Sequence, residues 1–205
     1  MPRARRVLLV DNHDSYTGNL FQLLWQQLGD APDVVESDAM DVQMLVAQNH
    51  SHIVIGPGPG TPHEGKDVGG SLELIRLTRA PLLGVCFGLQ AIVVALGGRI
   101  DRSPAPAHGV IDEVRHEESV LFAGLAATFP AVRYHSLCVQ GDPPAPLRTT
   151  AWASDGVLMA AEAPTRGLYG VQFHPESIGT PDGGRMIANF LATSSGSDAR
   201  ATGRW

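Results

Sequence analysis

Short apolar runs alternate with longer amphipathic segments in the first half of the chain. Apolar residues dominate positions 7–10, 52–55 and 81–85, and such runs are typical of strands that helices cover on both faces. A segment with one apolar face ends at Gly29, as expected of a helix that packs on a sheet. Further helices are expected over 41–49, 67–79 and 91–96, with a short strand at 34–35.

The second half has a different pattern, with strand candidates close together and few helices between them. The candidates lie at 110–115, 131–134, 149–153, 157–161 and 168–173, and a last helix is expected over 183–191. This pattern predicts one α/β domain over residues 1–192, built on an open, mostly parallel sheet flanked by helices, with a smaller antiparallel section. Residues 193–205 are rich in Ser, Gly, Ala and Thr, and we expect them to form a disordered tail.

Composition and charge exclude several classes of function. The chain has 205 residues, of which 43% are hydrophobic and 18% charged, and this suits one globular domain. Its formal net charge is -6, and no basic stripe interleaved with aromatic residues is present, so we expect no nucleic-acid partner. No apolar run approaches the roughly 20 residues of a membrane helix, and no secretory signal is recognisable, so we expect no membrane association. Two cysteines are too few for a disulfide framework, and the cytoplasm is the expected compartment.

The strongest local signal for chemistry is the segment Gly84-Val85-Cys86-Phe87-Gly88. It follows an apolar strand and opens a helix, which is the pattern of a nucleophile elbow with Cys in place of Ser. Glycines on either side let a sharp turn pack against neighbouring backbone, and a helix N-terminus favours the thiolate form of a cysteine. The pattern predicts Cys86 as a nucleophile, with a buried structural cysteine as the alternative.

A second signal lies at residues 172–177, where His174 and Glu176 follow another apolar run. A thiol nucleophile needs a base that takes its proton and later protonates the leaving group, and imidazole titrates in the right range. Glu176 can orient that ring from two positions away. Because both segments follow strands, the carboxyl edge of the sheet would bring them together. We therefore predict a catalytic triad of Cys86, His174 and Glu176, with a surface turn as the alternative for the His-Pro-Glu segment.

The Gly-Pro-Gly-Pro-Gly run at 56–60 also follows a strand. An oxyanion hole needs rigid backbone N–H groups near the nucleophile, and the N–H of Gly58 or Gly60, together with that of Phe87, could provide them. A tight surface turn is the alternative. No Gly-Lys-Ser/Thr follows, so the run is not a phosphate-binding loop, and the histidines and cysteines lack the spacing of a metal site. We therefore expect no metal in this chain.

Together these segments resemble class I, triad-type glutamine amidotransferases over about residues 7–192. The resemblance rests on the Cys86 elbow, the loop at 56–60 and the segment 170–177. It implies the flavodoxin-like fold of that family and L-glutamine as the substrate. It also implies that Cys86 attacks the side-chain carboxamide, that ammonia leaves as a thioester forms, and that water then releases glutamate. By position, the glutamine-binding residues would be Gly58, Gly60, Phe87, Gln90, Ser136 and Leu137.

Segments 11–16 and 133–137 narrow the resemblance to the chorismate-linked branch of the family. That branch implies a separate chorismate-aminating synthase subunit, which would receive the ammonia within a heterodimer or larger assembly. No cofactor is expected in this chain, and Mg²⁺ is expected only in the synthase partner. Segments 151–159 and 19–23 favour the glutaminase component of aminodeoxychorismate synthase, in the 4-aminobenzoate and folate pathway. The alternatives are anthranilate synthase component II, in tryptophan biosynthesis, and a homologue in specialised metabolism.

Two classes of protein outside this family remain as alternatives. One is an α/β hydrolase with a cysteine elbow and no glutamine pocket, and the other is a non-catalytic regulatory module on the same fold. The chain also departs from the family pattern. Phe87 stands where leucine is usual, Leu89 where histidine is common, and Val110 where lysine or arginine is frequent. None of these changes removes a catalytic group, and the Val110 change falls in a loop that tends to lie near the partner.

Overall fold

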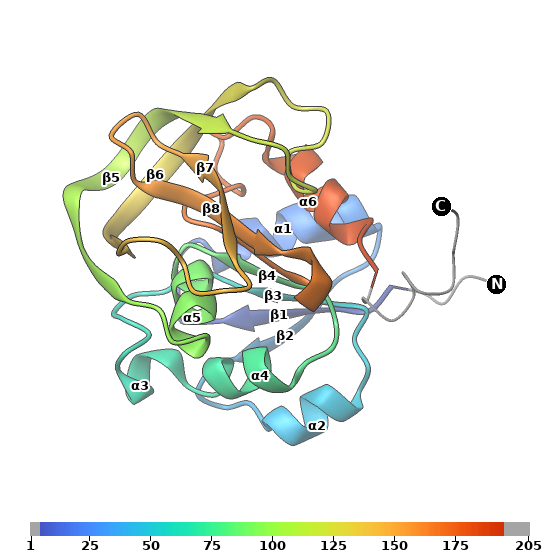
Figure 1. The fold of residues 1–205 in the computed structure, drawn as a ribbon. Helices are drawn as coiled ribbons and strands as arrows, with labels where there is room; N and C mark the ends of the chain where they lie inside the picture. Colours follow the sequence, from blue (N-terminus) through green and yellow to red (C-terminus); the bar gives the residue numbers. More distant parts are fainter. Residues whose placement is uncertain (1–4, 195–205) are drawn as a thin grey trace.

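The strands form one mixed sheet in the computed structural model, which describes residues 5–194 (Figure 1). The strands are β1 (Val7–Asp11), β2 (Asp33–Glu36), β3 (His52–Ile55), β4 (Leu82–Val85), β5 (Ile100–His116), β6 (Thr128–Val139), β7 (Arg148–Trp152), β8 (Leu158–Ala163) and β9 (Leu168–Val171). Their order in the sheet is β2-β1-β3-β4-β9-β8-β7-β5-β6. Strands from β2 to β9 in this order pair in parallel, and the pairs from β9 to β6 are antiparallel. The predicted fold class, an open α/β sheet with an antiparallel section, is confirmed.

Helices cover both faces of the parallel part, as Figure 1 shows. Alternate residues of β1 point to opposite faces, so Val7 and Leu9 lie in a different apolar cluster from Leu8 and Val10. The first cluster includes residues of α1 and α6, and the second includes residues of α2, α4 and α5. The helices are α1 (Thr17–Leu28), α2 (Val42–Ala47), α3 (Gly65–Val68), α4 (Ser71–Leu77), α5 (Phe87–Ala95) and α6 (Gly183–Leu191), with a 3-10 turn η1 (Pro164–Arg166).

The helix predicted over 67–79 is instead two short helices, α3 and α4, separated at Gly69. Its φ of +49° is rarely adopted by residues with a side chain, and a Cβ there would lie 2.1 Å from the Ser37 carbonyl oxygen. The N–H of Gly70 donates to that oxygen at 2.9 Å. The prediction was wrong because the periodic pattern carried no sign of this close backbone contact.

Strands β5 and β6 extend well beyond the predicted 110–115 and 131–134. The extended part of β5 contains Pro104 and Pro106, although proline cannot donate to a ladder. They lie where the register between β5 and β6 shifts, between Arg102 and Ala107, so the missing N–H groups interrupt no pairing. The strand continues past them through this bulge, and β6 pairs with β5 on both sides of it.

Helix α6 ends at Leu191, and the described chain continues to residue 194. Thr193 is still attached, because its carbonyl oxygen lies 3.1 Å from Nε2 of His52 and its Oγ1 donates to the Phe190 carbonyl at 2.7 Å. Most of the predicted tail, residues 195–205, lies outside the described residues. Within the described part, no helix has the length and apolar character needed to cross a membrane.

Candidate active site

Cys86 occupies a sharp turn between β4 and α5. Its backbone has φ +52° and ψ −101°, a conformation that residues with a side chain rarely adopt and that often marks functional sites. A Cβ on Gly84 would lie 2.3 Å from the backbone of Gly88, and a Cβ on Gly88 would lie 2.3 Å from the Ile55 carbonyl oxygen. The two glycines are therefore required by packing, and the turn has the predicted shape of a nucleophile elbow.

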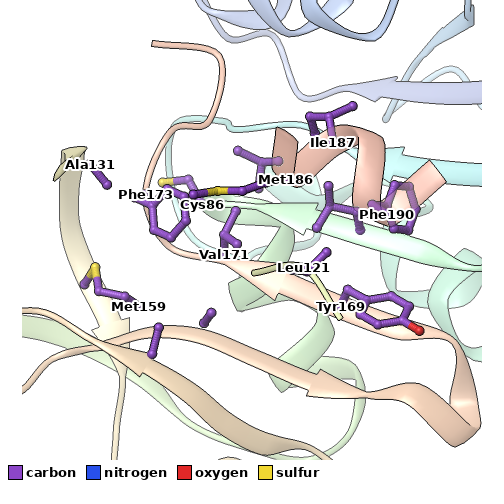
Figure 2. Close-up of a cluster of buried hydrophobic side chains, with 14 of the residues drawn as sticks. Cys86, Leu121, Ala131, Met159, Tyr169, Val171, Phe173, Met186, Ile187 and Phe190 are labelled. Carbon is purple, nitrogen blue, oxygen red and sulfur yellow. The ribbon is translucent and has the colours of Figure 1, made fainter. Parts of the chain in front are cut away.

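The turn places Cys86 at the carboxyl end of a central strand and at the N-terminus of α5. The first helical bond runs from the N–H of Gln90 to the Cys86 carbonyl at 3.2 Å, so the Phe87 N–H lies ahead of the helical ladder. The thiol is buried, and Figure 2 shows Cys86 within an apolar cluster, near Phe173, Val171 and Met186. A nucleophile here is shielded from bulk water on its inner side.

His174 and Glu176 form a close pair next to this turn. Nδ1 of His174 lies 2.6 Å from Oε1 of Glu176, and the two side chains are 2% and 0% exposed. Because a carboxylate can only accept, the proton of this bond is on Nδ1. Nε2 is left on the opposite side of the ring, and it makes no hydrogen bond of ordinary geometry to any described residue.

The surroundings of the imidazole favour its charged form. Burial lowers the pKa of His174, but interactions with Cys86 and the hydrogen bond and charge of Glu176 more than offset this effect and raise the pKa to about 10. An imidazolium can then face the sulfur at neutral pH. Such an imidazolium can donate a proton beside a cysteine nucleophile.

The loop after β3 lies against the elbow. A Cβ on Gly58 would lie 2.6 Å from Cβ of Asn12 and 3.4 Å from the Phe87 ring, so only glycine lets the loop approach this closely. Asn12 fixes the path of the loop, since its Nδ2 donates to the Gly56 carbonyl at 2.9 Å. Gly60 has φ +79° and lies against Asp67, which accepts from the N–H of Thr61 at 3.0 Å. The structure thus brings Gly58 beside Phe87, and Gly60 lies further along the same loop.

Gln90 joins the elbow to β6. This buried side chain donates from Nε2 to the Leu137 carbonyl at 3.1 Å and to Oε1 of Gln172 at 3.2 Å. Ser136 is exposed, and its hydroxyl lies 3.2 Å from Nε2 of His108 on β5. The predicted binding residues on α5 and β6 are therefore close together.

A buried ion cluster holds this part of β6 in place. Arg133 donates to Asp112 at 2.6 Å and to Asp155 at 2.9 Å, and its Nε donates to His135 at 3.2 Å. Burial and the positive charge of Arg133 lower the pKa of His135 to about 4, so its ring is neutral and donates from Nδ1 to the Leu137 carbonyl at 2.9 Å. The cluster thereby fixes the backbone that Gln90 also contacts.

Three further side chains lie at the site that were not among the predicted catalytic or glutamine-binding residues. Gln172 contacts the sulfur of Cys86, and the rings of Tyr16 and Tyr134 pack on His174 with centroid distances of 5.7 and 5.2 Å. The two tyrosine rings also pack on each other at 4.9 Å. Gln172 could have been found, because it is the first residue after its strand, as Cys86 is after β4.

One group of described residues has its ligand atoms close enough for a metal ion. It consists of His13, Glu36 and Asp38, whose atoms lie within 4.8 Å of one another, and all three are exposed. Exposed acidic side chains gather in this way without an ion, and the group has no connection to Cys86. It gives no reason to assign a metal.

Comparisons with known proteins agree with this geometry. Residues 8–194 match the family model of "Glutamine amidotransferase class-I". The chain is 48% identical to aminodeoxychorismate synthase of Streptomyces griseus over 185 residues, covering 90% of this chain and 25% of that protein. It is 42% identical to anthranilate synthase component 2 of Methanothermobacter thermautotrophicus over 199 residues, covering 90% of this chain and 97% of that protein.

The chain thus spans about a quarter of the length of the two Streptomyces synthases it matches. A solved glutamine amidotransferase from Thermotoga maritima shares the fold with a TM-score of 0.72, at 16% identity, over 85% of this chain and 77% of that one. The match of the family model over nearly the whole described chain places this protein in the class I glutamine amidotransferase family.

Proposed function

We propose that this chain hydrolyses L-glutamine and delivers the ammonia to a synthase subunit that aminates chorismate. The observation that carries the proposal is the meeting of Cys86, His174 and Glu176 at the carboxyl ends of β4 and β9, with a buried imidazole beside the sulfur. Membership of the family supports glutamine as the substrate. Similarity to aminodeoxychorismate synthase and to anthranilate synthase component 2 supports a chorismate-aminating partner.

In the proposed first step, the thiolate of Cys86 forms a bond to the side-chain carbonyl carbon of glutamine. The carbonyl electron pair moves onto oxygen, and the N–H groups of Phe87 and Gly58 stabilise that oxyanion. The C–N bond then breaks, and the imidazolium of His174 supplies the proton with which the amide nitrogen leaves as ammonia. A thioester remains on Cys86.

In the second step, water attacks the thioester while His174 takes a proton from it. The C–S bond breaks, glutamate leaves, and the thiolate and imidazolium are restored. Glu176 holds the Nδ1 proton throughout, which keeps Nε2 directed at the reacting atoms. The sum is glutamine plus water giving glutamate plus ammonia.

Gly58, Gly60, Gln90, Ser136 and Leu137 are the proposed contacts for the substrate. No cofactor takes part in this half of the reaction, and Mg²⁺ belongs to the synthase. Aminodeoxychorismate is the proposed product of the assembled enzyme, which agrees with the similarity to the Streptomyces synthases. Anthranilate is the other product to be tested. Anthranilate synthase component 2 of Methanothermobacter thermautotrophicus, a separate subunit by its name, is matched over 97% of its length.

The two cysteines provide a matched test. With the purified chain and glutamine, a diazo-ketone glutamine analogue should label Cys86, and Cys86→Ala should abolish glutamate formation. Cys138 is also buried, but its sulfur accepts from Gln140 and not from a triad residue, so Cys138→Ala should keep the activity. With the synthase subunit added, Cys86→Ala should abolish glutamine-dependent amination and spare amination by free ammonia.

Other outcomes identify the alternatives. If the analogue does not label Cys86, a cysteine hydrolase with another substrate becomes the better description. If Cys86→Ala leaves glutamine-dependent amination intact, the chain is a regulatory module. Mass spectrometry of the chorismate product distinguishes aminodeoxychorismate from anthranilate, and EDTA should inhibit the synthase step without affecting glutamate release.

A further inference from the structure

Gln172 is placed beside Cys86 by the register of two parallel strands. Val85 of β4 pairs with Val171 of β9, so the next residue of each strand extends the same row at the carboxyl edge. The backbone continues this pairing, since the N–H of Cys86 donates to the Val171 carbonyl at 2.7 Å. Gln172 is completely buried, although its side chain is polar, and a buried amide needs partners.

Its partners orient the amide toward the sulfur. Oε1 of Gln172 accepts from Nε2 of Gln90 at 3.2 Å, and the same Gln90 nitrogen donates to the Leu137 carbonyl at 3.1 Å. Because Oε1 is engaged as the acceptor, Nε2 is the atom that faces Cys86, and it donates to Sγ at 3.4 Å. The donor is therefore held from behind by a second buried amide.

The position of His174 bears on the role of the contact between Gln172 and the Cys86 sulfur. Its Nε2 makes no hydrogen bond of ordinary geometry, whereas Nε2 of Gln172 lies within hydrogen-bond distance of Sγ at 3.4 Å. A hydrogen bond from a neutral N–H to a charged acceptor is stronger than one to a neutral acceptor. The contact thus favours the thiolate over the thiol without supplying or taking a proton.

We propose that Gln172 is a positioning residue for the glutaminase reaction: it holds the Cys86 sulfur in the attacking position and stabilises its thiolate. This inference rests on the proposed function. It assigns to Gln172 a role in forming the nucleophile and not in binding glutamine.

A second Gln–Cys pair in the same chain gives a matched control. Nε2 of Gln140 donates to Sγ of Cys138 at 3.3 Å, which is the same kind of contact at a cysteine outside the site. Gln172→Met and Gln140→Met each replace an amide by a side chain of similar length that cannot donate. Both variants are compared with the unchanged chain in two assays, glutamine hydrolysis and alkylation of Cys86 by iodoacetamide followed by peptide mass spectrometry.

We expect Gln172→Met to lower kcat and the alkylation rate of Cys86 by about tenfold, the loss of roughly one charge-assisted hydrogen bond, with KM changed less than about threefold. Gln172→Glu should lower both rates further, since a carboxylate repels the thiolate. Gln140→Met should leave both rates unchanged. Thermal unfolding of each variant shows whether it is folded, and the alkylation assay needs no glutamine.

Two results would overturn the proposal. If Gln172→Met raises KM and leaves kcat and alkylation unchanged, the residue serves the substrate pocket through Gln90. If Gln172→Met and Gln140→Met lower the alkylation rate of Cys86 equally, the effect is a general loss of packing. Because alkylation reports the thiol directly, either result stands apart from a failure of the glutaminase assignment, which the Cys86→Ala experiment detects.

Discussion

The proton on His174 is the residue-scale feature with the clearest functional consequence. An imidazole of ordinary pKa would lose its charge near neutrality, whereas the raised pKa of about 10 keeps the ring charged over that range. The proton that ammonia needs is therefore already on His174 when glutamine binds. Its loss at alkaline pH should end the reaction.

The pH profile of glutamine hydrolysis tests this arrangement. We expect kcat/KM to fall on the alkaline side only as the pH approaches about 10. Glu176→Gln removes the carboxylate that raises the pKa of His174, so its alkaline limb should move to lower pH and kcat should fall on the order of 10²-fold. Glu117→Gln, at an exposed side chain, is the control and should leave the profile unchanged. An alkaline limb near 6.5 in the unchanged chain would contradict the charged resting state.

Much of the site at this scale could be predicted because its residues stand in recognisable local patterns. Cys86 lies between glycines after a strand, and His174 and Glu176 are two positions apart. Tyr16 and Tyr134 could not be predicted as neighbours of His174, because their contact depends on how a loop after β1 meets β6. Gln172 is an intermediate case. Its place directly after a strand could be read from the sequence, but the pairing of that strand with β4, which brings Gln172 to Cys86, could not.

The β4–α5 turn is the feature on which the site depends at the scale of elements. Gly84 and Gly88 touch backbone atoms that cannot move away, so the turn tolerates no side chain at either position. Gly18 in the first turn of α1 is the opposite case, because nothing lies within 4 Å of a Cβ built there. Two identical substitutions should therefore have opposite effects.

We expect Gly84→Ala to destabilise the fold by at least about 2 kcal/mol, since the added methyl overlaps the backbone of Gly88. Gly18→Ala should stabilise it by about 0.5–1 kcal/mol, because alanine restricts the unfolded chain more than glycine does. Urea unfolding of both variants measures the difference, and glutamine hydrolysis should be lost only in Gly84→Ala. Equal stability of the two variants would show that the elbow can relax.

The central strands were the most predictable elements, because an uninterrupted apolar run in a chain of this composition rarely forms anything other than a buried strand. The break at Gly69 and the length of β5 were not predictable in the same way. A glycine in an amphipathic segment signals a break only when another part of the chain, here Ser37, presses against it. The prolines in β5 interrupt no hydrogen bond of the ladder, because the register between β5 and β6 shifts at their positions.

For the whole molecule, the outer side of the triad is its most distinctive surface. Tyr16, Tyr134 and Glu176 line one wall of an open cleft of about 640 Å³, and Ile178 lies at the same cleft and is fully exposed. Ile111 is 61% exposed on β5, close to Gly179. Exposed apolar side chains grouped beside the proposed active site are better suited to contact with another subunit than with water.

We expect the synthase subunit to raise glutamine hydrolysis by this chain severalfold, because a partner that covers the cleft also shelters the ammonia. Ile178→Glu should reduce that rise and leave the rate of the isolated chain unchanged, since the side chain does not touch the triad. Ile178→Val keeps the apolar character and serves as the control. Steady-state rates with and without the synthase measure the effect, and equal rates would argue against activation by the partner.

The pairing of β4 with β9 also has a consequence for synthesis of the protein. Gln172 follows Cys86 by 86 positions, and the whole antiparallel section is made between them. At 5–20 residues per second, Cys86 is synthesised roughly 4 to 17 s before Gln172, and His174 follows two residues later. During that time the growing chain has the proposed nucleophile but not the proposed base, so the site is complete only when β9 has inserted between β4 and β8. Insertion of β9 is therefore the folding step that completes the proposed active site.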